Sequence, residues 1–199
     1  RELAEVGVEA ANLTIESKAS EAIVRRIEEL SGVNLKDCYQ CGKCAAGCPV
    51  APHADMTCRQ VIRDLQLGLV GSVLAAEMPW ACLGCSVCVA RCPQNVDMPS
   101  LMVAIKRVAK EHGIVASRDA KVFDDVFLGV VRQTGISDEA ILAGGYNMLS
   151  GHVLQDVASV PAMMKNGLLE PSLPRTVDEV GEIKSLFGRC EEKGGVDYE

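Results

Sequence analysis

The chain contains one cysteine run twice, and this repeat constrains its fold more than any other feature. The runs extend over residues 38–49 and 82–93, and both follow the pattern C-x2-C-x2-C-x3-C-P. Every cysteine of the first run recurs 44 positions later, so that Cys38 corresponds to Cys82. A repeat at a fixed offset indicates that one site-forming unit occurs twice. The fold must therefore place two equivalent cysteine loops.

The spacing within each run is typical of ligands for a 4Fe-4S cluster. Two-residue gaps let one tight loop turn three thiolates towards three corners of a cubane, while the fourth corner needs a more distant sulfur. In two-cluster ferredoxins with this run, the fourth cysteine ligates the other cluster, which forces the clusters to be neighbours. The predicted ligands are Cys38, Cys41, Cys44 and Cys92 for cluster 1, and Cys82, Cys85, Cys88 and Cys48 for cluster 2.

Two other uses of cysteine fit the runs less well. Zinc sites also contain C-x2-C pairs, but four ligands satisfy zinc, which does not require the further cysteines and the following proline, all repeated. Disulfide frameworks belong to short secreted chains, whereas this sequence shows no signal-peptide core. No apolar stretch approaches the roughly 20 residues that a membrane helix needs. We therefore expect a cytoplasmic protein without direct membrane insertion.

Net charge and composition further limit the function and the fold that the chain can have. The net charge of −7 and the lack of a basic face argue against a nucleic-acid partner. Aromatic residues make up only 4% of the chain, so aliphatic side chains must build the core. These apolar residues recur at helical spacing, and no stretch shows convincing strand alternation. We expect an all-α protein with an extended or docking segment at 1–17, a domain with two cluster loops at 18–115, and a helical extension for partner docking at 116–199.

Several residues are expected to mark the ends of helices in the cluster-loop domain. Ser20 is expected to cap a first helix, and Gly32 is expected to end it. Residues 57–60 form a capping box for a helix in the insert between the two runs. A short helix is expected at 72–77, with Pro79 ending it.

The extension is predicted to contain further helices. An apolar face that begins at Val122 is expected to end at Gly135, and Ser137 is expected to restart a short helix. The pair Gly144-Gly145 is expected to form a turn or a helix stop. Residues 176–179 form a second capping box, which predicts the start of the last helix.

Together, these features resemble the α-helical ferredoxin fold and, within it, the family of heterodisulfide reductase C subunits. The resemblance covers about residues 18–115 through the runs and, more loosely, the tail through residues 160–167 and the final helix. The chain lacks the Cys-Cys-Gly element of the disulfide-reducing domain, which some relatives fuse to the ferredoxin. It also lacks the plant-type ferredoxin domain that precedes this module in succinate dehydrogenase. A stand-alone C subunit is therefore expected.

The resemblance implies both a function and partners. Such proteins are iron–sulfur relays that carry single electrons from a flavin-containing, electron-bifurcating A subunit to a Cys-Cys-Gly-containing B subunit, which reduces a disulfide. We expect no substrate turnover by this chain alone, because it contains no nucleophile–base pair, Walker loop or dinucleotide motif. The alternatives are an iron–sulfur component of another respiratory-type dehydrogenase or reductase, and an iron–sulfur redox sensor.

Two cysteines lie outside the runs, and neither is needed for ligation. Cys58 and Cys190 are expected to be buried, inert thiols, because free cysteine behaves as a small apolar residue. Cys58 follows the capping residue Thr57, where a helix N-terminus can lower the pKa of a thiol. It is therefore the better candidate of the two for further thiol chemistry.

Overall fold

Helices make up all of the regular structure in the described part of the computed structural model, which covers residues 18–155, 157–167 and 176–192. The prediction of an all-α fold is thus confirmed. The predicted segment at 1–17 lies outside the described residues. The chain divides into two compact units, one within residues 1–117 and one within residues 118–199. Within the described residues, no helix is both long enough and apolar enough to cross a membrane.

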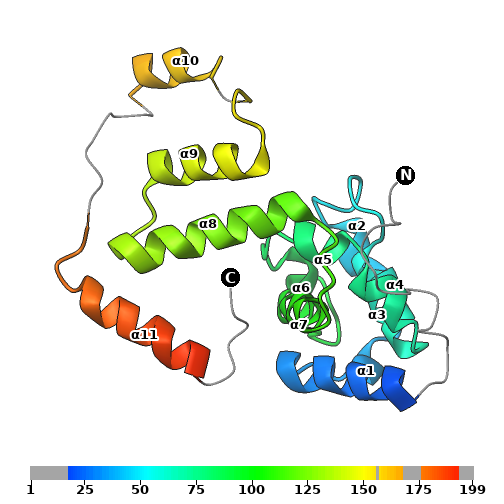
Figure 1. Cartoon of the computed structure of the whole chain (residues 1–199). Coiled ribbons are helices and arrows are strands. Elements are labelled where there is room, and N and C mark those ends of the chain that lie inside the picture. Colours follow the sequence, from blue (N-terminus) through cyan, green and yellow to red (C-terminus); the bar gives the residue numbers. More distant parts are fainter. Residues whose placement is uncertain (1–17, 156, 168–175, 193–199) are drawn as a thin grey trace. The chain divides into compact units, whose positions relative to one another are not determined.

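The first unit is built around α7 (Met98–Glu111), which contacts α1 (Lys18–Ser31), α4 (Val70–Leu74) and α5 (Met78–Ala81) (Figure 1). One face of α7 is no more than 1% exposed and consists of Leu101, Met102, Ile105, Val108 and Ala109. Burial of each large aliphatic side chain contributes roughly 1.5–3 kcal/mol. The remaining helical elements are η2 (Leu35–Asp37), α2 (Lys43–Ala46), α3 (Cys58–Gln66) and α6 (Val87–Ala90).

The helix α1 ends as expected but does not use Ser20 as its cap. Gly32 adopts a left-handed backbone with φ of 68°, and its N–H donates to the carbonyl of Glu28 at 2.8 Å. This is a common way for a helix to stop. Ser20 instead lies inside α1 and is only 2% exposed. The expected cap is therefore wrong, because the helix already includes Lys18.

The insert between the runs confirms one expected boundary and corrects another. The Thr57 side chain accepts from the Gln60 N–H, and the Gln60 side chain accepts from the Thr57 N–H, which completes the predicted capping box of α3. Pro79 does not end a helix at 72–77. It lies in the first turn of α5, where its missing N–H costs no hydrogen bond. The carboxylate of Asp55 accepts from the first backbone N–H groups of this turn, at 2.8 and 3.0 Å.

In the second unit, α9 (Glu139–Ser150) and α11 (Val180–Glu192) both pack on α8 (Arg118–Thr134), and a short α10 (Val160–Lys165) follows α9 (Figure 1). Three expected boundaries are wrong here. Asp138, not Ser137, caps α9, and its side chain accepts from two backbone N–H groups at 3.1 Å. The pair Gly144-Gly145 lies inside α9. The last helix begins at Val180, after the predicted capping box.

Glycine inside α9 has a packing reason. A Cβ atom at Gly145 would lie 2.9 Å from Cγ1 of Val126 on α8, which is closer than real Cβ atoms come. The absence of a side chain therefore allows α8 and α9 to approach each other. Two adjacent glycines favour a turn, but the close approach of α8 and α9 explains why Gly145 is a glycine.

Candidate iron–sulfur centre

The repeat in the sequence is also a repeat in the structure. The short helices α2 and α6 occupy corresponding positions in the two runs and contact each other. Each follows a residue with a left-handed backbone, Gly42 with φ of 82° and Ser86 with φ of 59°. The helices carry the third cysteine of each run, Cys44 and Cys88. The two loops therefore meet at their third cysteines.

A second pair of left-handed residues lies between the first and second cysteines of the runs. Gln40 and Gly84 correspond at the 44-residue offset, and each has φ of 64°. This conformation costs an L-residue about 1–2 kcal/mol but suits glycine. At this pair the first run bears the strain, whereas at the pair Gly42 and Ser86 the second run bears it.

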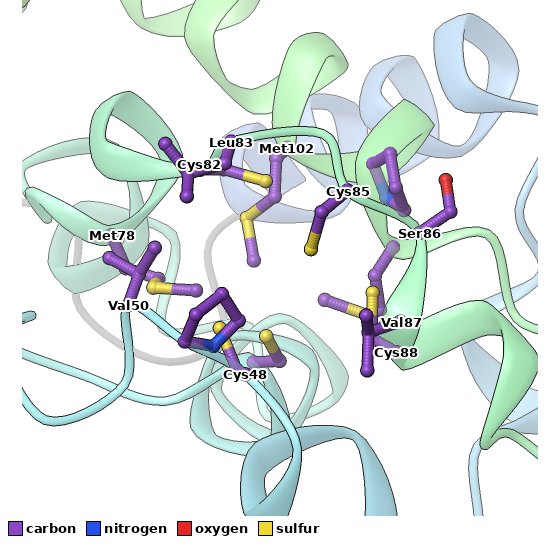
Figure 2. A pocket seen from close by; sticks show the side chains of 14 residues that line it. Cys48, Val50, Met78, Cys82, Leu83, Cys85, Ser86, Val87, Cys88 and Met102 are labelled. Carbon is purple, nitrogen blue, oxygen red and sulfur yellow. The ribbon is translucent and has the colours of Figure 1, made fainter.

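A cavity of about 360 Å³, counted with its open mouth, lies where the second run faces α3 and α7. Figure 2 shows predicted cluster ligands around this cavity, with the sulfur of Cys85 turned towards its middle. Methionine, valine, leucine and proline side chains supply most of the remaining lining. The cysteines at this cavity are Cys48, Cys58, Cys82, Cys85 and Cys88. The set contains all four ligands predicted for cluster 2, including the one from the first run.

The ligands predicted for cluster 1 influence one another electrostatically. Burial raises the pKa of the Cys44 thiol, and the neighbouring thiolates of Cys38 and Cys41 raise it further. The pKa of Tyr39 is raised by desolvation, then by Cys41 and by Cys92. Tyr39 thus lies near cysteines of both runs. A ligand set that draws on both runs is consistent with this proximity.

The two ligand sets also touch each other. Burial raises the pKa of Cys88 to about 11, and the thiolates of Cys82 and Cys44 contribute to the rise. Cys44 and Cys88 belong to different predicted clusters, so their interaction indicates that the two sites are neighbours. Ligation requires the thiolate form, and cluster binding must therefore release protons from these cysteines.

The donors fit an iron–sulfur cluster well. Thiolate sulfurs in an apolar cavity are the ligands that such clusters use, and the surrounding side chains limit the access of water. Among the described residues, no three Cys, His, Asp or Glu side chains converge closely enough to hold a single metal ion. The second cysteine of each run, Cys41 and Cys85, is exposed.

The cysteines outside the runs differ from each other. Cys58 is only 3% exposed and forms part of the core, as expected. Its pKa is raised, first by burial and then by Cys48 and Cys44, so the idea that the helix N-terminus lowers it is wrong. Cys190 is exposed, which contradicts the expectation of a buried thiol. Sequence reasoning also missed Gln40, although its replacement by glycine in the second run distinguishes the two loops.

Comparisons with known proteins identify the domain that contains both cysteine runs. Residues 34–96 match the family model described as a 4Fe-4S dicluster domain. The chain is 34% identical over 97 residues to the iron-sulfur C subunit of a CoB--CoM heterodisulfide reductase from Methanopyrus kandleri, covering 49% of this chain and 50% of the relative.

Two further relatives have similar names. The identity is 37% over 83 residues to the C2 subunit of an H(2)/formate:CoB-CoM heterodisulfide,ferredoxin reductase from Methanococcus maripaludis, covering 42% of this chain and 45% of the relative. It is 33% over 103 residues to a protein from Archaeoglobus profundus that is named as similar to the heterodisulfide reductase C subunit, covering 51% of this chain and 55% of the relative. The chain thus spans about half the length of these relatives.

These matches confirm two predictions from the cysteine runs. Residues 34–96 carry a 4Fe-4S dicluster domain, so the chain is an iron–sulfur protein with two 4Fe-4S clusters. The resemblance to the heterodisulfide reductase C subunit is also confirmed over the matched half of the chain. The division of the eight cysteines between the clusters stays a prediction.

Proposed function

We propose that this chain is the iron–sulfur electron-transfer component of a heterodisulfide reductase-like complex. The observation that carries this proposal is the contact between α2 and α6, the helices that hold Cys44 and Cys88. Two neighbouring one-electron centres form a short path through the protein. Relatives named as C subunits of heterodisulfide reductases support this function over other uses of the fold.

The chain serves electron transfer by holding and shielding its cofactors. A 4Fe-4S cluster supplies one-electron redox chemistry when it is bound. Eight cysteines fill the corners of two such clusters and leave no position for a substrate. Two-electron chemistry such as disulfide reduction needs a flavin, a nicotinamide or a specialised site. We therefore assign substrate turnover to other chains of the complex.

The proposed partners are a flavin-containing iron–sulfur protein on one side and a Cys-Cys-Gly-containing protein that reduces a disulfide on the other. The second unit is a candidate docking module for them, because it exposes large apolar side chains. Its most exposed examples are Met148 at 74% and Leu154 at 76%. Apolar side chains at such exposure are common at protein interfaces. We place the complex in the cytoplasm, where reducing conditions preserve free thiols for cluster binding.

The test is to purify the full chain anaerobically and to measure its iron, its electron uptake and its turnover. We expect about eight iron and eight sulfide per chain, and uptake of two electrons from dithionite, one per cluster. Disulfide reduction should occur only when the partner proteins are added. A Cys190→Ser variant is the matched control, because this exposed thiol lies outside both runs. Rapid disulfide turnover by the chain alone, or zinc in place of iron, would contradict the proposal.

A further inference from the structure

Two hydrogen bonds reach sulfurs that are predicted to ligate cluster 1. The side-chain amide of Gln40 donates through Nε2 to Sγ of Cys38 at 3.5 Å. The backbone N–H of Val96 donates to Sγ of Cys92 at 3.4 Å. Hydrogen bonds to ligand sulfurs are one of the factors that set the potential of an iron–sulfur cluster.

The repeat removes both donors from cluster 2. At the 44-residue offset, Gly84 takes the place of Gln40 and has no side chain to donate. Pro52 takes the place of Val96, and proline has no backbone N–H. The thiol of Cys58 does contact Cys48, but a thiol is a weaker donor than an amide. The two sites therefore share a loop shape and differ in their hydrogen bonds.

The position of Gln40 is built for this contact. Its backbone has the same φ as Gly84, although only glycine adopts this conformation without strain. Its Nε2 also lies 3.4 Å from Oε1 of Gln66. The Gln66 amide is itself fixed by donation to the carbonyls of Leu35 and Cys38, at 2.8 and 3.0 Å. A strained residue that its neighbours hold in place is typical of a functional position.

Nearby cations do not separate the two loops, because each run contains one, Lys43 in the first and Arg91 in the second. Lys43 lies beside Cys44 in the first run, and at the same offset Val87 lies beside Cys88. Reduction adds a negative charge to a cluster, and part of that charge resides on its sulfurs. An amide donor or a nearby cation stabilises this charge, so each raises the reduction potential. Because Lys43 and Arg91 are both exposed, solvent and salt screen their effects, and the amide of Gln40 is the stronger influence.

We propose that Gln40 is a positioning residue that holds the reduction potential of cluster 1 above that of cluster 2. The inference rests on the proposed electron-transfer function and adds the direction in which electrons flow between the clusters. Electrons move towards the centre with the higher reduction potential. The difference therefore favours electron flow from the partner at the cluster 2 loop towards the partner at the cluster 1 loop. The repeat thus keeps the left-handed backbone positions of both loops while the groups that hydrogen-bond to sulfur change.

The test compares two replacements of Gln40 in the anaerobically purified full chain. Gln40→Gly removes the donor and relieves the backbone strain, as Gly84 does in the other loop. Gln40→Met removes the donor but keeps the strain and the side-chain length. A redox titration followed by paramagnetic resonance gives the two midpoint potentials of each protein. Both variants should lower the higher midpoint by a similar amount and leave the lower midpoint in place.

We expect the Gln40 variants to change the ratio of reduced to oxidised cluster 1 by up to about tenfold at a fixed potential. For a one-electron couple, this change corresponds to a midpoint shift of about 59 mV. The reciprocal variant Gly84→Gln should raise the lower midpoint. A Cβ atom at Gly84 meets nothing within 4 Å, so the loop has room for the new side chain.

Three results would overturn the inference: no shift in either Gln40 variant, a shift of the lower midpoint only, or a shift in Gln40→Gly that Gln40→Met does not reproduce. The last result would assign the effect to backbone strain. These outcomes are separate from failure of the proposed function. The wild-type chain would show that failure by an iron content far below eight per chain or by turnover without partners.

Discussion

At the scale of single residues, the structure places cysteines that share one sequence pattern in different surroundings. All eight cysteines of the runs follow one pattern, yet Cys48 lines a cavity with three cysteines of the other run. Cys58 belongs to neither run and lies in the same cavity. The spacing predicted the crossed arrangement through its similarity to known two-cluster ferredoxins. The spacing could not predict that Cys58 also lines the cavity, because its position there depends on the packing of α3.

Replacement of Cys92 by alanine tests the crossed arrangement directly. We expect the variant to lose the paramagnetic signal of the cluster bound by Cys38, Cys41 and Cys44, because that cluster then lacks its fourth thiolate. The iron content should fall by up to four per chain, while the other cluster remains. Cys58→Ala is the matched control and should retain about eight iron, since this buried cysteine is not a predicted ligand. Damage confined to the cluster of Cys82, Cys85 and Cys88 would refute the assignment.

At the scale of helices, the local signal at Thr57 is confirmed, whereas the start of α5 and the role of Gly145 depend on distant residues. The box at Thr57 is local, and the structure contains both of its hydrogen bonds. The start of α5 depends on the carboxylate of Asp55, which lies 22 and 23 positions before the backbone groups that it caps. A proline alone does not show whether it ends one helix or begins the next. Likewise, Gly145 suggested a turn because its role depends on Val126 of another helix.

The cap of α3 provides a test at this scale. Thr57→Ala removes the side-chain acceptor for the Gln60 N–H, and we expect a loss of about 0.5–2 kcal/mol in the free energy of unfolding. Denaturant titration of the full chain under anaerobic conditions measures this loss. Thr57→Ser keeps the hydroxyl and should retain most of the stability. Equal stability of the alanine variant and the wild type would show that the packed face of α3 suffices without the cap.

At the scale of the whole molecule, the predicted cluster ligands and the helices α8 to α11 belong to different units of the chain. The core made by Val61, Leu65, Leu101, Ile105 and their neighbours lies entirely within the first unit. Every predicted ligand lies there as well. The second unit contributes α8 to α11, which pack on one another through α8 and α9 and through α8 and α11. The first unit therefore has its own core and its own ligands.

Removal of residues 118–199 tests this separation. We expect the shortened chain to keep its two clusters, with close to eight iron and an unchanged visible spectrum, because its core is complete. It should no longer co-purify with the partner proteins, since the exposed apolar side chains of the extension would be absent. Normal assembly of the shortened chain would show that the extension is not the dock. Loss of both clusters would show that the extension supports the cluster domain.

The exposure of Cys41 and Cys85 has a consequence for how the protein is made and damaged. These two cysteines occupy the same position in each loop and are the exposed members of their runs. We expect cluster assembly to begin at this accessible thiol, which can be reached without opening the core. The same access admits oxidants, which convert exposed thiolates to sulfenic acid and beyond. The two loops therefore present the same corner to solvent, and we expect oxidants to reach each loop there first.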